Sequence, residues 1–287
     1  MYVANSKIEL INYIETAKRL NNSLKINFVP TMGALHKGHL QLIKQAKETN
    51  NLTIVSIFVN PLQFNDLKDF QTYPQTLTED LTLCQSYGVD LVFCPKLEDV
   101  YNNPLDQSFL IEPPAYLTNT LCGLQRLNHF TGVATVVLKL FNIVKPNIVF
   151  MGLKDYQQYV IIQNLCKDLF LDIEIIGVET VREDDGLALS SRNKLLSEEN
   201  RKLAPILYRT LIEMKTALLN GGDVDFVLQQ NEANLKTKIN LEYLTIVSAA
   251  RLIPLTQLIK PALIAIAAKF GNVRLIDNVL VDNKSKN

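Results

Sequence analysis

Short apolar runs and longer segments with helical spacing alternate along the first part of the chain. The runs contain many β-branched residues, which is typical of parallel strands buried on both faces. They lie at 26–29, 52–59, 89–93, 147–151 and 172–178. Apolar residues three and four positions apart predict helices at 6–20, 39–46, 77–87, 130–144 and 156–169. Strands that alternate with helices predict an α/β fold with a parallel sheet and right-handed crossovers.

The pattern changes after residue 178, where a long polar loop interrupts the alternation. Beyond it we predict two helices, at 197–219 and 225–238, followed by antiparallel strands. The strands are expected at 243–248, 262–270 and 273–277. The sequence therefore predicts two domains, 1–179 and 180–287, of which the second is a smaller α+β domain. The last residues, 282–287, are polar and predict a disordered tail.

The stretch from Phe28 to Ala46 is the centre of the predicted site. We expect Pro30 to end the first strand, since proline cannot extend a central ladder. A tight turn follows, and helical spacing begins at His39. A helix N-terminus presents unpaired N–H groups and binds anions, and Gly38 would let a ligand approach the backbone. The stretch predicts a cradle for nucleotide phosphates.

Polar segments follow four of the predicted strands, at 31–39, 60–63, 152–155 and 179–182. In open parallel sheets, ligands bind outside the carboxyl ends of the strands. Two histidines of the first segment, His36 and His39, can donate N–H bonds to phosphate. Two partly exposed histidines near a helix cap, or half of a metal site, are the alternative interpretations.

Other polar residues support the same site but also have simpler interpretations. Lys154 and Asp155 form either a phosphate contact or an ordinary charged turn. Ser190, Ser191 and Arg192 form either a phosphate clamp or a solvated linker. Gln63 is either a substrate contact or an ordinary turn residue, and Gln158 is a candidate substrate contact. Arg126 and His129 either hold an anion or cap the next helix. Glu79 and Asp80 are expected to be surface charges, with a Mg²⁺ contact as the alternative.

Composition narrows the classes of function. Lys+Arg and Asp+Glu number 29 each in 287 residues, so the chain lacks the basic excess of a dedicated nucleic-acid binder. Four cysteines without paired spacing suit a reducing cytosol and predict neither disulfides nor structural zinc. No signal-peptide pattern and no apolar run of about 20 residues is present. We expect a cytoplasmic protein that contacts neither membrane nor nucleic acid.

These segments together resemble the pantothenate synthetase family of HxGH-motif nucleotidyltransferases, in the family's order and from about residue 28 to 193. The matching segments are Pro-Thr-Met-Gly-Ala-Leu-His-Lys-Gly-His (30–39), Phe-Val-Asn-Pro-Leu-Gln-Phe (58–64), Asp-Phe-Gln-Thr-Tyr-Pro (69–74), Arg-Leu-Asn-His-Phe-Thr-Gly-Val (126–133), Gly-Leu-Lys-Asp-Tyr-Gln-Gln (152–158) and Val-Arg-Glu-Asp-Asp-Gly-Leu-Ala-Leu-Ser-Ser-Arg-Asn (181–193).

The resemblance implies a Rossmann-like N-terminal domain, a smaller C-terminal lid domain and a homodimer. It implies that pantoate and β-alanine are condensed with ATP and Mg²⁺ through a pantoyl-adenylate, releasing AMP and pyrophosphate. Catalytic roles are implied for His36, His39, Lys154, Ser190, Ser191 and Arg192. ATP contacts are implied for Met32, Gly33, Ala34, Leu35, His36, Lys37, Gly38, His39, Gly152, Leu153, Lys154, Asp155, Val181, Leu189, Ser190, Ser191 and Arg192. Gln63 and Gln158 would hold pantoate, and Gln63 would also face β-alanine; the ligands of Mg²⁺ stay open.

Three positions depart from the family pattern: Leu153 replaces a usual Glu, Leu189 a usual Met and Lys37 a usual acidic residue. None of them removes a group that the chemistry needs. Two other functions stay open, another adenylyl-transferring enzyme of the superfamily and a nucleotide-binding module without catalysis. The intact set of His36, His39, Lys154 and Arg192 argues against the second.

Overall fold

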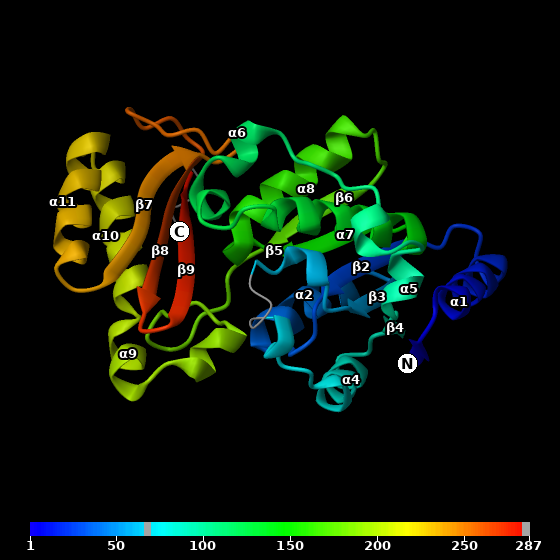
Figure 1. Cartoon of the computed structure of the whole chain (residues 1–287). Helices are drawn as coiled ribbons and strands as arrows, with labels where there is room; N and C mark the ends of the chain where they lie inside the picture. The colour runs from blue at the N-terminus through cyan, green and yellow to red at the C-terminus, as the bar shows by residue number, and fades with distance from the viewer. Residues whose placement is uncertain (66–69, 283–287) are drawn as a thin grey trace. The chain divides into compact units, whose positions relative to one another are not determined.

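The computed structural model in Figure 1 describes residues 1–65 and 70–282 and divides into two compact units. The first unit comprises Met1–Pro113, Arg126–Leu153 and Ile161–Glu179. The second begins at Thr180 and also includes Pro114–Gln125 and Lys154–Val160, two short segments from within the range 1–179. Asp69, which begins the matching segment 69–74, and residues 283–287 of the predicted tail lie outside the described residues.

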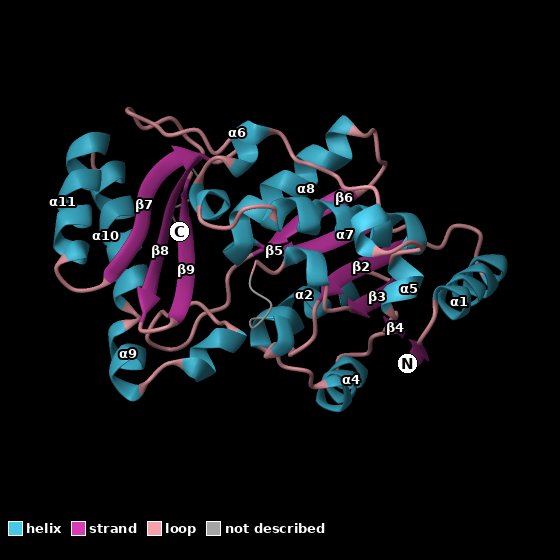
Figure 2. Cartoon of the chain, viewed as in Figure 1, coloured by secondary structure: helices cyan, strands magenta, loops and turns pink. Residues whose placement is uncertain are grey.

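A parallel sheet forms the centre of the first unit (Figure 2). Its strands are β1 (Tyr2–Ala4), β2 (Ile26–Thr31), β3 (Leu52–Ile57), β4 (Leu91–Phe93), β5 (Ile148–Gly152) and β6 (Glu174–Val178). Their order in space is β1-β4-β3-β2-β5-β6, and every recorded pair is parallel. The predicted α/β class and Rossmann-like sheet are confirmed. The three-residue β1 was not predicted, since it is too short to show a period.

The strand order reverses at β2, which lies between β3 and β5. β2 pairs with β3 along its whole length, from Ile26 to Thr31, but with β5 only at Asn27 and Phe28. The carboxyl ends of β2 and β5 therefore lie at the topological switch point, where open α/β sheets bind their ligands. The turn that follows Thr31 and the turn that begins at Gly152 leave the sheet at these two ends.

Pro30 does not end β2, and that prediction is wrong. The strand continues to Thr31, and Pro30 is paired in register with Ser56 of β3. The pairing with β5 has already ended at Phe28, so this part of β2 has a ladder partner on one side. A proline is tolerated where a strand needs no donor on its second side.

Helices cover both faces of this sheet. They are α1 (Lys7–Leu20), α2 (Lys37–Lys47), α4 (Leu77–Ser86), α5 (Leu97–Val100), α7 (His129–Val144) and the later part of α8 (Tyr156–Asp168). Val29, Val55 and Val92 belong to one buried cluster with Ile43 of α2. Phe28, the neighbour of Val29 on β2, instead meets Phe141 of α7 edge-to-face. Successive side chains of a strand face opposite sides, so both faces of the sheet are buried.

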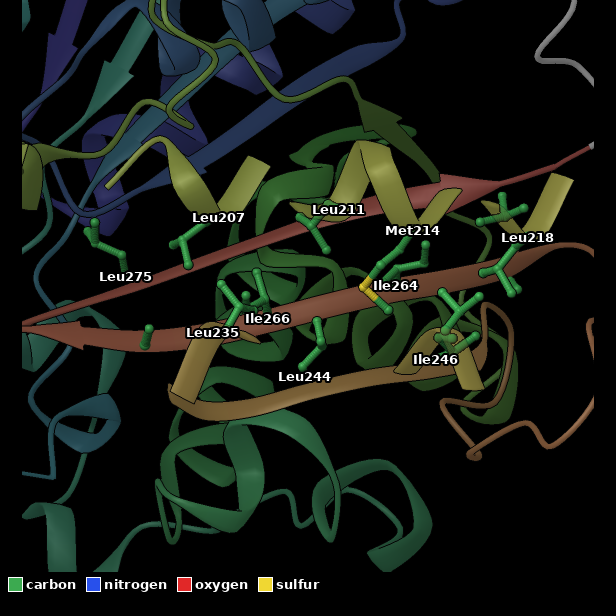
Figure 3. Close-up of a cluster of buried hydrophobic side chains, with 14 of the residues drawn as sticks. Leu207, Leu211, Met214, Leu218, Leu235, Leu244, Ile246, Ile264, Ile266 and Leu275 are labelled. Atoms are coloured by element: carbon green, nitrogen blue, oxygen red, sulfur yellow. The ribbon is translucent and has the colours of Figure 1, made fainter. Parts of the chain in front are cut away.

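The second unit packs helices against a small antiparallel sheet. The strands are β7 (Asn240–Ser248), β8 (Ala262–Phe270) and β9 (Val273–Val281), and the helices are α6 (Ala115–Thr118), α9 (Glu198–Leu203), α10 (Ile206–Leu219) and α11 (Val224–Lys236). Figure 3 shows Met214 of α10 beside Ile264 of β8, and Leu211 belongs to the same buried cluster. The helix predicted at 197–219 is broken before Ile206, because Pro205 has no N–H to continue it.

All four cysteines are free, as predicted. Burial raises the pKa of the Cys84 thiol to about 12, and the nearby Asp80 carboxylate adds to the rise. Among the described helices, none has both the length and the apolar content needed to cross a bilayer.

Candidate active site

A buried carboxylate holds the turn between β2 and α2. Asp80 of α4 is 1% exposed. Its Oδ2 accepts the N–H of Ala34 at 2.9 Å and its Oδ1 accepts the N–H of Leu35 at 2.7 Å. The Thr76 hydroxyl donates to Oδ2 at 3.2 Å. Successive backbone N–H groups form a nest for an anion, and Asp80 supplies that anion from within the protein.

The conformation of this turn explains why it needs such support. Gly33 and Ala34 both have positive φ, +80° and +50°. An Ala residue in the left-handed region costs about 1–2 kcal/mol, so the bonds from Ala34 and Leu35 to Asp80 offset a real cost. A Cβ at Gly33 would lie 3.0 Å from Asp80 Oδ2. Glycine at position 33 therefore allows the positive φ angle and also leaves room for the Asp80 carboxylate.

The prediction that Asp80 is a surface charge is wrong, whereas Glu79 is exposed as expected. The prediction of exposure for Asp80 rests on the charge of its side chain alone. One signal in the sequence pointed the other way: Asp80 precedes the buried Cys84 by four residues, so both lie on one face of α4. The carboxylate is tolerated inside because backbone donors satisfy both of its oxygens.

The two histidines of the motif form a reciprocal cap on α2. The helix begins at Lys37, two residues earlier than predicted, and His36 is its N-cap. Nδ1 of His36 accepts the N–H of Gly38 at 3.1 Å, and Nδ1 of His39 accepts the N–H of His36 at 3.3 Å. The ring centroids are 4.1 Å apart. In the neutral rings an accepting Nδ1 places the proton on Nε2, so each ring presents Nε2–H as its donor.

Gly38 has a role in the cap itself, in addition to the predicted one. A Cβ at this position would lie 2.8 Å from Cε1 and 2.9 Å from Nδ1 of His36. The absence of a side chain therefore makes room for the His36 ring, and the approach of a ligand to this backbone stays a prediction. The spacing H-x-G-H follows from this geometry, because the ring of the first histidine lies over the glycine and the second histidine returns to the first backbone N–H.

A second group of bonds fixes Gln63, which ends the short helix η1 (Pro61–Gln63). Nε2 of Gln63 donates to Sδ of Met32 at 2.8 Å, so the predicted pantoate residue touches the β2–α2 turn. Asn60, which is 1% exposed, caps η1 and donates to the carbonyl of Gly132 at 3.1 Å. The Tyr101 hydroxyl donates to Asn60 Oδ1 at 2.8 Å. The sequence did not reveal this supporting role of Asn60, because an Asn before Pro signals only a turn.

Arg126 and His129 support the backbone of the same glutamine. Nδ1 of His129 lies 2.6 Å from the Gln63 carbonyl oxygen, and Nη1 of Arg126 lies 2.9 Å from Nε2 of His129. Arginine only donates, so His129 Nε2 accepts and Nδ1–H donates to Gln63. Asn128, and not either of these residues, is the N-cap of α7. Support of the Gln63 backbone is thus a role that neither earlier interpretation included.

The second unit contains the remaining predicted residues. The carbonyl oxygen of Lys154 accepts the side-chain amide of Asn278 at 2.8 Å, and its Nζ lies 3.8 Å from the exposed Asp155. Gln158 is half-buried on α8. The neighbouring Gln157 is buried and bonds to the backbone of residues 117, 120 and 122. The two adjacent glutamines therefore differ: Gln157 is buried and joins segments of the second unit, whereas Gln158 is half-buried.

Ser190, Ser191 and Arg192 lie in an ordered turn rather than in an irregular loop. Ser190 caps the short helix η5 (Ser191–Leu195), and its Oγ accepts the N–H of Arg192 at 3.3 Å. Val181 and Leu189 flank a hairpin that leads into this turn, joined by an N–H to carbonyl bond of 3.0 Å. These five residues are half-buried.

The structure thus groups the predicted residues in two sets. The first unit brings together the turn 32–39 with Gln63, and it includes Gly152 and Leu153 at the end of β5. Lys154, Asp155, Gln158, Val181, Leu189, Ser190, Ser191 and Arg192 belong to the second unit. Lys37, the first residue of α2, is exposed to solvent.

A cavity of about 380 Å³ lies beside the turn, at the carboxyl ends of β2, β3 and β4. Apolar side chains such as Phe58 and Leu97 form most of its wall, together with Asp80. Of the residues predicted to contact substrates, its lining includes Met32 and Gly33.

Within residues 1–65 and 70–282, no three His, Cys, Asp or Glu side chains are grouped to hold a metal ion. Both Asp80 oxygens accept backbone N–H groups. The donor set therefore does not fit a resident cation at Asp80.

Removal of the Asp80 charge tests the proposed constraint on the turn. We expect Asp80→Asn to lower the free energy of unfolding by about 1–3 kcal/mol, because an amide nitrogen cannot accept one of the two N–H bonds. Urea unfolding measures the change. The exposed neighbour Glu79 provides the matched control, and Glu79→Gln should change stability by less than about 0.5 kcal/mol. Equal stability of the two variants would show that the carboxylate does not hold the turn.

Comparison with known proteins places this arrangement in a family. The family model described as pantoate-beta-alanine ligase matches residues 3–280. A pantothenate synthetase from Bacillus pumilus is 46% identical over 89% of this chain and 88% of its own length. A bifunctional pantoate ligase/cytidylate kinase from Synechococcus elongatus is 48% identical over 90% of this chain, but the chain spans about half the length of that relative.

Solved structures agree with these matches. The crystal structure of pantothenate synthetase from Thermus thermophilus has a TM-score of 0.89 and 40% identity, covering 98% of this chain and 100% of that one. Pantoate-beta-alanine ligase from Francisella tularensis, solved with beta-gamma ATP and beta-alanine, has a TM-score of 0.77 and 38% identity, covering 98% of each chain. The chain belongs to the pantoate-beta-alanine ligase family.

Proposed function

We propose that the protein condenses pantoate with β-alanine, using ATP and releasing AMP and pyrophosphate. The observation that carries this proposal is the H-x-G-H turn at the switch point of the sheet. Its two Nδ1 atoms cap the helix, and the Nε2–H groups are the donors that a phosphate needs. The bound ATP and β-alanine named for the Francisella tularensis relative support the same substrates here.

The first step activates a carboxylate, which is a poor acyl donor. A pantoate carboxylate oxygen attacks the α-phosphorus of ATP, the bond to the bridging oxygen breaks, and pyrophosphate leaves. Charge moves onto the phosphate oxygens, so catalysis consists of positioning and of stabilising that charge. The Nε2–H groups of His36 and His39 are suited to donate to these oxygens. Lys154, Ser190, Ser191 and Arg192 remain predicted contacts of the triphosphate.

The second step forms the amide. The β-alanine amine attacks the acyl carbon of the pantoyl-adenylate, AMP leaves, and the amine loses a proton. Gln63 is predicted to hold pantoate and to face β-alanine, and its position is set by Met32, Asn60 and His129. The Gln63 amide has two N–H donors, so one can contact the Met32 sulfur while the other donates to a substrate oxygen. Gln158 remains the second predicted pantoate residue.

Three further expectations belong to this proposal. Mg²⁺ enters with ATP as the MgATP substrate and is bound mainly by phosphates and water, as Mg²⁺ prefers. The protein is a homodimer. It works in the cytoplasm, where four free cysteines stay reduced.

Dependence of AMP release on both acceptors tests the reaction. We expect AMP to form only when pantoate and β-alanine are both supplied, because the adenylate forms on pantoate and is consumed by the amine. Chromatography of the nucleotides measures this, with pyrophosphate release as the second readout. AMP release that continues without pantoate would reject the assignment, and ATP binding without turnover would favour a nucleotide-binding module.

Loss of one donor tests the role of the motif. His39→Ala should slow single-turnover formation of the adenylate by at least ~10²-fold, the lower range for a positioned donor. Lys44→Ala, at an exposed position on the same helix, is the control and should leave the rate unchanged. Circular dichroism confirms that both variants fold. A near-normal rate in the folded His39 variant would remove His39 from the mechanism.

A further inference from the structure

Two adjacent polar residues lie buried in the middle of β9. Asp277 is 3% exposed and Asn278 is 8% exposed. Asp277 follows Leu275 at the spacing of one strand face, and Leu275 belongs to the apolar core of this unit. A carboxylate in such a place is costly unless hydrogen bonds and an opposite charge compensate for the lost water. Asp277 is the last residue of the strand predicted at 273–277, but β9 continues through it to Val281.

The compensating charge comes from the hairpin that precedes the Ser190 turn. Arg182 donates from Nη1 to Asp277 Oδ2 at 2.6 Å and from Nη2 to Oδ1 at 2.9 Å. Nη1 also donates to the carbonyl of Gly186 at 3.1 Å, and the guanidinium lies 3.7 Å from the ring centre of Tyr208. Arg182 is therefore held on its edges and on one face, and a bidentate pair fixes direction as well as distance.

The hairpin connects this ion pair to the predicted phosphate residues. Arg182 is bridged to Ala188 across the hairpin, and the N–H of Glu183 donates to the carbonyl of Leu187 at 2.8 Å. Ser190 follows two residues after Ala188. The side chain of Asn193 then donates back to the Ala188 carbonyl at 3.1 Å. The position of the Ser190 turn is thus tied to Asp277 through a short, bonded piece of chain.

Asn278 connects the same point of β9 to the turn that carries Lys154. Its backbone N–H donates to Asp277 Oδ1 at 2.8 Å, and its side-chain Nδ2 donates to the Lys154 carbonyl at 2.8 Å. Its own carbonyl accepts Nη2 of Arg182 at 3.3 Å. One dipeptide of β9 therefore holds two segments that are distant in sequence, one around Lys154 and one leading to Ser190.

We propose that Asp277 and Asn278 are positioning residues for ATP, which set the backbone of Lys154 and of the Ser190–Arg192 turn in one fixed arrangement. This inference rests on the proposed function, because that function gives these two segments their triphosphate contacts. Lysine and arginine side chains are flexible, so the cost of ordering them on a ligand falls when their backbones are already fixed. Neither Asp277 nor Asn278 needs to touch the nucleotide for this effect.

The test compares two asparagines that make the same kind of bond. Asn278→Ala removes the donor to the Lys154 carbonyl, and Asn231→Ala removes an equivalent 2.8 Å bond to the Val227 carbonyl in α11. We expect Asn278→Ala to raise the Kd for ATP, measured by calorimetry, at least ~5-fold, the value of one hydrogen bond. Asn231→Ala should leave this Kd unchanged. Both variants should leave the KM for β-alanine within twofold.

Equal ATP affinity in the two variants would overturn the proposal, as would a parallel rise in the KM for β-alanine, since that would mark a general structural defect. If Asn278→Ala does not fold, Arg182→Lys decides, because lysine keeps the charge but cannot pair with both Asp277 oxygens. It should also raise the Kd for ATP. An unchanged Kd in that folded variant would contradict the proposal.

A failure of the proposed reaction can be distinguished from a failure of the positioning role of Asp277 and Asn278. A wild-type protein that releases no AMP in the presence of pantoate and β-alanine would contradict the reaction. Calorimetry with ATP alone would still decide whether Asn278 positions a nucleotide contact.

Discussion

The bonds from Asp80 to the N–H groups of Ala34 and Leu35 are the constraint on which the rest of the site depends. They hold a turn with two successive positive φ angles at Gly33 and Ala34. That turn determines where α2 begins and therefore where its first residues point. A buried carboxylate in a backbone nest occupies the place that an anionic ligand takes in other helix-start sites. The turn is consequently formed without a ligand, and the nucleotide of the proposed reaction is expected to bind beyond it.

The next consequence concerns the two histidines. Because the turn delivers His36 to the N-cap, its Nδ1 and the Nδ1 of His39 are engaged with backbone N–H groups. Each ring then has one orientation and one tautomer, which is the preorganisation that stabilisation of transition-state charge requires. The simple interpretation as helix-capping histidines and the catalytic interpretation are therefore compatible, since different nitrogens of the same ring serve the two roles.

Much of the architecture could be predicted from the sequence because the β-branched runs and the helical spacing are strong signals. The parallel sheet, the small antiparallel sheet and the placement of polar segments after strands all came from such patterns. The two failures that concern buried charge have one physical cause. Asp80 and Asp277 are charges inside apolar faces, and pattern reasoning treats charge as exposure. Their partners, Ala34 with Leu35 and Arg182, lie 45 to 95 positions away. No local pattern can reveal a carboxylate that is satisfied over such distances.

The tautomers of the three histidine rings test the central claim most directly. The chain has only three histidines, so nitrogen NMR of the ligand-free protein resolves each ring. The account predicts Nε2–H tautomers for His36 and His39 and the opposite Nδ1–H tautomer for His129, which donates to the Gln63 carbonyl. In Asp80→Asn, the His36 and His39 signals should shift or average while that of His129 stays unchanged. A proton on Nδ1 of His39, or histidine signals indifferent to Asp80→Asn, would contradict the claim that this carboxylate sets the motif.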